Sequence, residues 1–424
     1  MKKLLLAVFS IATTFSLYAQ REVPQERMEQ IYEEVKTPYK YGLAVAPADN
    51  YHKIDCPTVF RQGDKWLMTY VVYNGKGGTD GRGYETWIAE SDNLLEWRTL
   101  GRVLSYRDGK WDCNQRGGFP ALPDMEWGGS YELQTYKGRH WMTYIGGEGT
   151  GYEAVKAPLY VGLAWTKGNI STAHEWESLD KSILSIHDKD AQWWEKLTQY
   201  KSTVYWDKDK TLGAPFVMYY NAGGRHPETD LKGERVGIAL SKDMKTWKRY
   251  SGNPVFAHEA DGTITGDAHI QKMGDVYVMF YFSAFEPSRK YKAFNTFAAS
   301  YDLVNWTDWK GADLIIPSKN YDELFAHKSY VVKHDGVVYH FYCAVNNAEQ
   351  RGIAIATSKP MGRSAVRFPV PESKNRRQII ELNEGWKTWR VENGKLRVES
   401  EKTVNIPHNW DDYYGYRQLT HGNL

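Results

Sequence analysis

Cysteine is scarce in this 424-residue chain. Its only cysteines are Cys56, Cys113 and Cys343, which lie far apart and show no C-x-x-C spacing. This pattern excludes a disulfide framework and gives no sign of a cysteine-bound metal. No acidic cluster has the spacing of a calcium loop. The sequence therefore predicts that no cofactor or metal is required, and it leaves open whether a structural calcium ion lies within the fold.

A sustained charge of one sign is also missing. The 54 lysines and arginines are balanced by 52 aspartates and glutamates, which leaves a formal net charge of +2. Attraction to a phosphate backbone needs a field of one sign over a surface. We therefore expect no nucleic-acid partner.

Long hydrophobic runs are absent beyond the first residues. The chain opens with Lys2 and Lys3, an apolar run at residues 4–9 and a small residue, Ala19, near a possible cleavage point. A charged start followed by a short apolar core is typical of a secretory signal, whereas a membrane helix needs about 20 apolar residues. We therefore expect residues 1–19 to be a signal peptide, a periplasmic or secreted location and no membrane insertion.

Aromatic residues are abundant. The chain has 17 tryptophans and 30 tyrosines. Flat rings with polar edges suit the apolar faces and hydroxyl groups of sugars, although aromatic residues also fill β-sheets. The composition favours a carbohydrate partner without showing which rings contact it.

An internal repeat organises the chain. A seven-residue phrase that begins with Ser and ends with Trp occurs at residues 91–97, 241–247 and 300–306, and a looser copy ends at Trp176. Each copy follows three short apolar runs, as expected for the turn before the last strand of a four-stranded blade. The repeat predicts an all-β fold, a five-bladed β-propeller over residues 51–360.

The two ends of the chain have different patterns. Residues 20–50 are predicted to hold a helix at 23–35 and a lead-in, and a second short helix is expected at 190–199. Residues 361–380 are predicted to be a linker. Residues 381–424 contain Pro407-His408-Asn409-Trp410, which resembles the opening of the jelly-roll sugar-binding domain of family 2 glycoside hydrolases. We expect a partial C-terminal β segment, the truncated start of that domain; a tail packed on the propeller is the alternative.

Polar residues on the first strand of each blade are the candidate binding residues. The innermost strands of a propeller converge on one end of its channel, where buried polar groups need a partner. The candidates for binding substrate are Asp55, Arg116, Lys201, Asp267, His269 and His327.

Two glutamates are the candidate catalytic residues. Glu153 and Glu234 each lie in a glycine-containing loop before the third strand of a blade. Glycoside cleavage needs one carboxylic acid to protonate the leaving oxygen and one carboxylate as nucleophile or base. Glycine allows such a loop to direct a side chain into the channel. The alternative is that both glutamates are solvated.

The repeat and the Asp55-Cys56-Pro57 phrase resemble family 43 and related furanosidase propellers over residues 40–360. That resemblance implies a catalytic base at Asp55. The stretch 266–269 reads Gly-Asp-Ala-His, without the Glu-Gly-Pro phrase that carries the acid of that family, and Lys201 stands where an aspartate is expected. The usual triad of family 43 is therefore incomplete here.

The chain is more similar to glycoside hydrolase family 137, propeller β-L-arabinofuranosidases that can precede a family 2 module. This resemblance implies that Glu153 is the nucleophile or base and Glu234 the acid. It implies a monomeric enzyme, fused to a family 2 module, that removes terminal β-L-arabinofuranose from a branched pectin of the rhamnogalacturonan II type. The partner would be an oligosaccharide or polysaccharide.

Three alternatives stay open from the sequence. They are a family 43-like furanosidase of other specificity, a mannoside phosphorylase of the same shape and a non-catalytic carbohydrate-binding propeller. A phosphorylase needs a cluster of cations for phosphate, and the candidate cations are spread over several blades. Retention or inversion depends on the gap between the two carboxyl groups, about 5–5.5 Å in retaining enzymes.

Overall fold

The computed structural model describes residues 22–75, 81–152 and 158–370, and short strands at 389–392, 395–398 and 403–404. The predicted signal peptide and the phrase at 407–410 lie outside the described residues. The chain divides into two compact units, Met1–Pro369 and Val370–Leu424.

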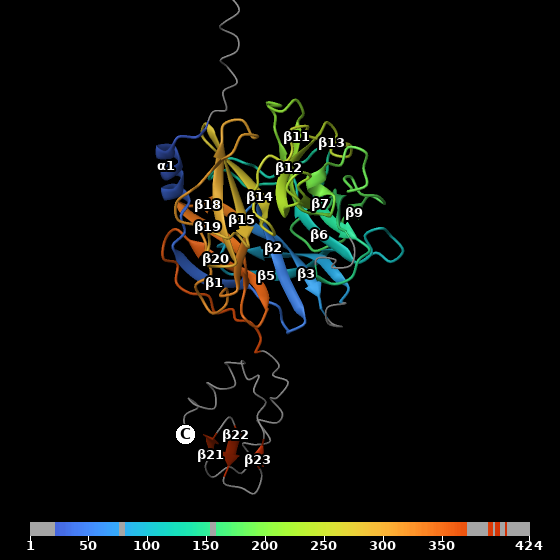
Figure 1. The fold of residues 1–424 in the computed structure, drawn as a ribbon. Helices are drawn as coiled ribbons and strands as arrows, with labels where there is room; N and C mark the ends of the chain where they lie inside the picture. Colours follow the sequence, from blue (N-terminus) through green and yellow to red (C-terminus); the bar gives the residue numbers. More distant parts are fainter. Residues whose placement is uncertain are drawn as a thin grey trace, which may run out of the picture. The chain divides into compact units, whose positions relative to one another are not determined.

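The first unit is built mainly of β-strands (Figure 1). Its strands in chain order are β1 Tyr39–Val45, β2 His52–Gln62, β3 Lys65–Asn74, β4 Gly83–Ser91, β5 Arg98–Leu104, β6 Gln115–Pro120, β7 His140–Gly147, β8 Tyr160–Thr166, β9 Glu177–Ser178, β10 Thr198–Trp206, β11 Phe216–Arg225, β12 Lys232–Ser241, β13 Trp247–Arg249, β14 Ile264–Met273, β15 Val276–Ala284, β16 Ala293–Ser300, β17 Thr307–Asp308, β18 Phe325–His334, β19 Val337–Val345 and β20 Arg351–Thr357.

These strands follow one repeating order. Strands β2 to β5 form one antiparallel sheet and β6 to β9 another. An eight-stranded sheet contains β10 to β13 and β14 to β17, joined by one parallel pair, Glu234 with Ile264. In the last sheet β18, β19 and β20 are followed by β1, so the N-terminal strand pairs with the C-terminal end of the unit.

The first strand of each set packs against the neighbouring set. Strand β6 contacts β3 and β4, β10 contacts β7, β14 contacts β11, β18 contacts β15 and β16, and β2 contacts β19 and β20. Most residues on the long strands are buried, for example all nine of β19, because each sheet is covered on both faces. This packing brings the first strands of different sets close together.

The Ser-to-Trp phrase forms the turn between third and fourth strands, as predicted. The Ser241 hydroxyl oxygen accepts a hydrogen bond from the Met244 N–H at 3.0 Å, and the Asp243 carboxylate accepts one from the Thr246 N–H at 2.7 Å. The Trp247 indole N–H donates to the Met244 carbonyl at 2.8 Å. These local bonds fold the phrase by itself, so it has a structural role.

Helix is confined to two short segments of the described first unit. Helix α1, Gln25–Val35, buries Met28, Ile31 and Val35 against the core, as the 23–35 pattern predicts. The helix predicted at 190–199 is wrong: only the 3₁₀ turn η3, Trp193–Glu195, forms there, and β10 follows it. Glu195 is fully buried and accepts a hydrogen bond from the Arg249 side chain at 2.6 Å, a tertiary contact that overrides local helix preference.

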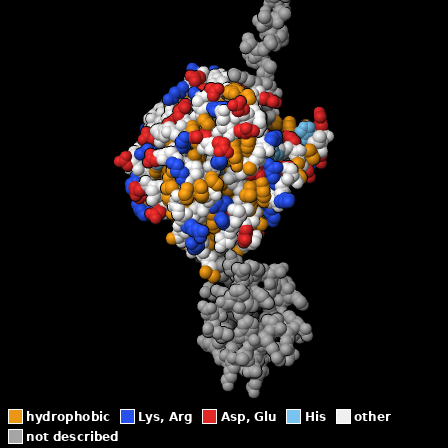
Figure 2. Space-filling model, turned by 90° about the vertical axis from the view of Figure 1, so that its left-hand side faces the viewer, with side chains coloured by type: hydrophobic (Ala, Val, Ile, Leu, Met, Phe, Trp, Pro, Cys, Tyr) orange, Lys and Arg blue, Asp and Glu red, His pale blue; other side chains and the backbone are white. Residues whose placement is uncertain are grey.

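The second unit contains a three-stranded antiparallel sheet in the order β21 Trp389–Glu392, β22 Lys395–Val398 and β23 Thr403–Val404. Among the described residues of the whole protein, no helix has both the length and the apolar character needed to cross a membrane. Positive and negative side chains are interspersed over the face of the first unit that Figure 2 shows, in keeping with the balanced composition.

Candidate active site

The first strands of four sets carry an irregularity at the same place. Register shifts interrupt β2 after Asp55, β10 after Gln199, β14 after Gly266 and β18 after His327. A bulge of this kind bends a strand and redirects its side chains. The backbone φ is +51° at Cys56, +57° at Asp267 and +58° at Lys328, so a repeated backbone distortion points residues of different sets toward one place.

A pocket of about 160 Å³ lies at this meeting point. Four of the predicted residues line it, namely Lys201, Glu234, Asp267 and His327. Aromatic rings form much of the remaining wall. The pocket therefore combines charged groups with flat apolar surface, the combination that sugar binding requires.

Asp55 lies fully buried behind this lining. Its Oδ2 accepts a hydrogen bond from the Lys328 ammonium at 2.7 Å and from the Tyr152 hydroxyl at 2.5 Å. Arg351 Nη1 is 3.7 Å from the same oxygen and donates to the Tyr152 hydroxyl oxygen at 2.8 Å. Burial alone would raise the pKa of Asp55, but Lys328 and, less strongly, Arg351 hold that pKa well below its usual range. Asp55 is therefore a carboxylate at neutral pH.

Asn221 connects the carboxyl group of Glu234 with the backbone of Asp267. Its Nδ2 donates to Glu234 Oε2 at 3.1 Å, and its Oδ1 accepts from the Asp267 backbone N–H at 3.3 Å. The Glu234 backbone N–H donates to the Thr263 carbonyl at 3.0 Å, next to the parallel pair with Ile264. The Glu234 carboxyl group is thus held at the junction of two four-stranded sets.

Lys201 presents a buried ammonium group to the pocket. Its Nζ is 3.6 Å from Asp267 Oδ2 and 5.4 Å from the centre of the Phe119 ring. Within the described residues this nitrogen makes no hydrogen bond. A buried ammonium group with unused donors is unfavourable unless a ligand accepts from it. A sugar hydroxyl in the pocket would do so.

His327 is neutral at physiological pH. Its ring is buried, with Nδ1 3.3 Å from the Cys343 carbonyl oxygen and an edge contact to Phe282. Burial lowers the pKa of His327 to about 3. Among the described residues, Asp55, His327 and Cys343 bring possible ligand atoms within 4.8 Å of one another. The Lys328 ammonium already occupies the Asp55 oxygen, so this group fits a metal ion poorly.

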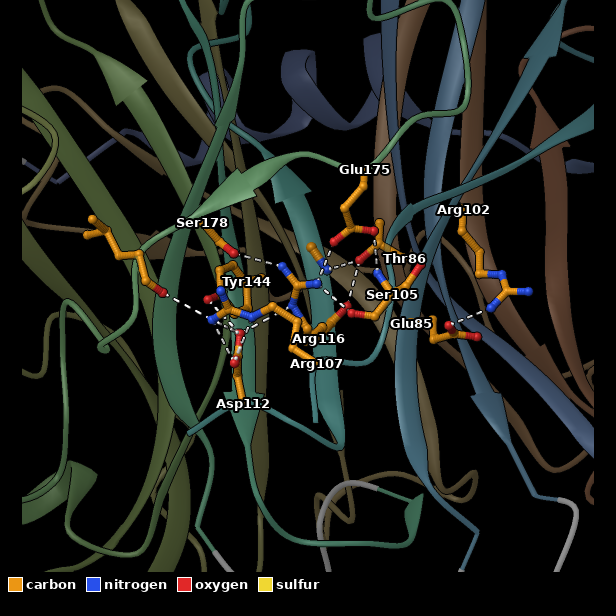
Figure 3. A network of polar contacts seen from close by, with 12 residues as sticks. Glu85, Thr86, Arg102, Ser105, Arg107, Asp112, Arg116, Tyr144, Glu175 and Ser178 are labelled. Carbon is orange, nitrogen blue, oxygen red and sulfur yellow. Dashed lines mark hydrogen bonds and ion pairs between the residues drawn. The ribbon is translucent and has the colours of Figure 1, made fainter. Parts of the chain in front are cut away.

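Arg116 does not line the pocket, contrary to its predicted role in binding substrate. Figure 3 shows it inside a polar network, where Nη1 lies 2.6 Å from Glu175 Oε1, Nε lies 3.2 Å from Asp112 Oδ2 and Nη2 donates to the Ser178 hydroxyl at 2.9 Å. Strand β6 pairs with β7 in continuous register. Because β6 has no bulge at this place, the Arg116 side chain stays within the packing between sheets.

His269 also lies outside the pocket lining, and its predicted contact with substrate has no support in this position. Its ring stacks on the Tyr330 ring with the ring centres 3.7 Å apart, and its Nε2 lies 3.1 Å from the Val331 carbonyl oxygen. His269 follows the bulge of β14. Beyond the bulge, side chains again alternate between the two faces of the strand, and that of His269 faces β18.

The predicted pair of glutamates is described only in part. Glu234 lines the pocket, whereas Glu153 lies outside the described residues. Its neighbour in sequence, Tyr152, does line the pocket and donates to Asp55. Asn221, Tyr152 and Arg351 are pocket residues that the sequence did not predict. Lys328, which follows His327 on the first strand of its set, lines the pocket and occupies the same bulge position as Cys56 and Asp267.

No protein-family model and no curated protein matches the chain. Among solved structures, one described as a complex of BT0996 with RGII is 96% identical, has a TM-score of 0.82 and covers 83% of this chain and 100% of its own. A second, described as "Glycoside hydrolase", is 95% identical with the same TM-score and the same coverage. A thermostable family-43 glycoside hydrolase is 15% identical, has a TM-score of 0.50 and covers 85% of this chain and 97% of its own, which bears on the fold alone.

The repeated sheets and the pocket where their first strands meet form a propeller-like fold similar to that of the family-43 enzyme. Together with the near-identical structures, they show that this protein belongs to the glycoside hydrolases.

Proposed function

We propose that this glycoside hydrolase removes a terminal β-L-arabinofuranose from a branched side chain of rhamnogalacturonan II. One observation carries the proposal: Glu234, Asp267 and the buried Lys201 converge on a single small pocket. A pocket of this size suits one terminal sugar better than the middle of a polysaccharide. The RGII complex described for the 96% identical structure supports the choice of polymer.

We further infer a closed propeller of five blades, with β1 completing the last blade beside β20. The propeller-like fold and the position of Glu234 in the pocket support family 137 membership. In this proposal the enzyme is exported through its signal segment, acts as a monomer and continues into a family 2 module.

The proton donor is assigned by elimination among the described carboxyl groups. A general acid must be protonated before reaction, which requires a raised pKa. Asp55 is held ionised by Lys328, so it is unsuited to that role. Asp267 lies 3.6 Å from the Lys201 ammonium nitrogen, an opposite charge that is unfavourable for a proton donor, whereas Glu234 lines the pocket and its carboxyl group is held by Asn221. We assign Glu234 as the acid and Glu153 as the nucleophile or base, with Lys201 and Asp267 binding sugar hydroxyls.

The test is to incubate the enzyme with rhamnogalacturonan II oligosaccharides and identify the monosaccharide released. We expect arabinose, and a rate at least about 10³-fold lower for Glu234→Gln. Glu132, which is exposed, provides the matched control Glu132→Gln, expected to keep full activity. Release of another sugar contradicts the arabinose specificity, and a strict need for phosphate indicates a phosphorylase. Binding without any release indicates a non-catalytic module.

A further inference from the structure

Phe285 lines the pocket although its exposed side chain and its backbone conformation are both unfavourable for stability. It directly follows β15 and lines the pocket, yet its side chain is 50% exposed. Its backbone φ is +57°, a left-handed conformation that is unfavourable for residues with a β-carbon. Of the exposed large hydrophobic residues in the described part of the protein, Phe285 alone combines this conformation with a place in the pocket wall.

The surrounding contacts hold this conformation. The Phe285 backbone N–H donates to the Lys292 carbonyl at 2.8 Å, which closes the loop between β15 and β16. Its ring meets the Phe325 ring edge-on with the ring centroids 6.0 Å apart. The Phe325 ring in turn lies beside the His327 ring, with centroids 5.5 Å apart. Phe282 is only 3% exposed, and its ring meets the same histidine ring edge-on with centroids 5.4 Å apart. Aromatic surface therefore runs from the buried part of the pocket to its exposed part.

The exposed end of this aromatic surface lies where the part of the substrate outside the pocket would pass. A terminal sugar held by Lys201, Asp267 and Glu234 must keep its glycosidic bond directed toward solvent, because the rest of the substrate extends from it. The next sugar ring then meets the exposed wall. Sugar rings pack their C–H faces on aromatic rings.

We propose that Phe285, supported by Phe325, is the platform for the sugar ring on the leaving side of the cleaved bond, and so selects branched oligosaccharides over simple glycosides. This inference rests on the proposed function, since it places the terminal sugar in the pocket. It explains why a strained, exposed aromatic residue stands where glycine or asparagine would fit the backbone more easily.

The test compares kcat/KM for two substrates. One is a rhamnogalacturonan II side-chain oligosaccharide that ends in β-L-arabinofuranose, and the other is methyl β-L-arabinofuranoside. For Phe285→Gly and Phe285→Leu, we expect the loss on the oligosaccharide to exceed the loss on the methyl glycoside by about tenfold or more. Phe285→Tyr keeps a flat ring and should restore the oligosaccharide preference. The half-exposed Tyr51 supplies the control Tyr51→Leu, expected to match the wild type.

Thermal unfolding separates this role from a structural one. Phe285→Gly removes the backbone strain and should melt no lower than the wild type. Equal losses on both substrates, or an unchanged oligosaccharide rate in Phe285→Gly, overturn the platform. If the wild type releases arabinose from neither substrate, the proposed function fails separately. In that case the affinity for the same oligosaccharide tests the proposed role of Phe285. Weaker binding by Phe285→Gly than by the wild type supports the role, and equal binding overturns it.

Discussion

The Lys328 ammonium nitrogen lies 2.7 Å from Asp55 Oδ2, although the two residues are 273 positions apart in the sequence. Asp55 is fully buried and Lys328 nearly so. The contact joins β18 of the last sheet to β2 of the first, directly behind the pocket. It both stabilises the packing of these sheets and fixes the charge of the carboxyl group.

Loss of Lys328 should therefore destabilise the protein strongly. Lys328→Met leaves a buried carboxylate without its main partner, which we expect to lower the free energy of unfolding by about 3–5 kcal/mol. Denaturant unfolding at pH 7 measures the change. The double variant Lys328→Met/Asp55→Asn removes both charges and should recover part of the loss; a double variant no more stable than Lys328→Met contradicts this explanation.

Asp55 should contribute stability that disappears in acid. Its folded pKa lies below the unfolded value of about 3.9. Its contribution is therefore complete above the unfolded pKa and is lost as pH falls toward the folded pKa. The difference in unfolding free energy between wild type and Asp55→Asn should be constant from pH 7 to 5 and narrow below about pH 4. A constant difference down to pH 2.5 would refute the assignment.

His327 should also weaken the fold in acid, but over a higher pH range than Asp55. Its pKa of about 3 in the folded protein lies below the unfolded value of about 6.5. Between these values the unfolded state binds a proton that the folded protein does not, so stability falls with falling pH by about 1.4 kcal/mol per unit. Between pH 6 and 4, His327→Gln should reduce the slope of unfolding free energy against pH by about 1.4 kcal/mol per unit, the contribution of one bound proton. The exposed His187 gives the control His187→Gln, for which no such reduction is expected.

Arg116 should prove to be a structural residue. Arg116→Met leaves the buried Asp112 with one fewer cation, and we expect a loss of about 3–5 kcal/mol in unfolding free energy. At a temperature where the variant stays folded, kcat/KM should remain within about twofold of the wild type. A large rise in KM in the folded variant would restore the substrate-binding role that the sequence suggested.

Lys201 should show the kinetic effect that Arg116 lacks. Lys201→Met removes a buried ammonium group that has no hydrogen bond within the described residues and that pairs with the buried Asp267. We therefore expect kcat/KM of the folded variant to fall by about 10- to 100-fold, together with a loss of unfolding free energy. Lys196 is exposed and donates to the Ile186 carbonyl, which makes Lys196→Met the matched control. Unchanged kinetics for Lys201→Met would remove it from the binding site.

The sequence predicted the site in part because the repeat has a regular strand order. Asp267, Lys201 and His327 were found from their place on first strands, and all three line the pocket. His269 was misplaced because a bulge shifts the alternation of side chains along β14. Asn221 lies on the second strand of its set, β11, and was missed because only first strands were expected to contribute.

The sequence by itself determined the features that depend on short-range bonds: the turns of the Ser-to-Trp phrase, the order of strands that those turns connect and the amphipathic helix α1. A hydroxyl and a carboxylate within seven residues complete such a turn wherever it lies. Only the tertiary structure decided which polar residues share one pocket. Bulges redirect the side chains, and contacts such as that of Lys328 with Asp55 exist only after distant sheets have packed together, because no local pattern records the distance between two strands in space.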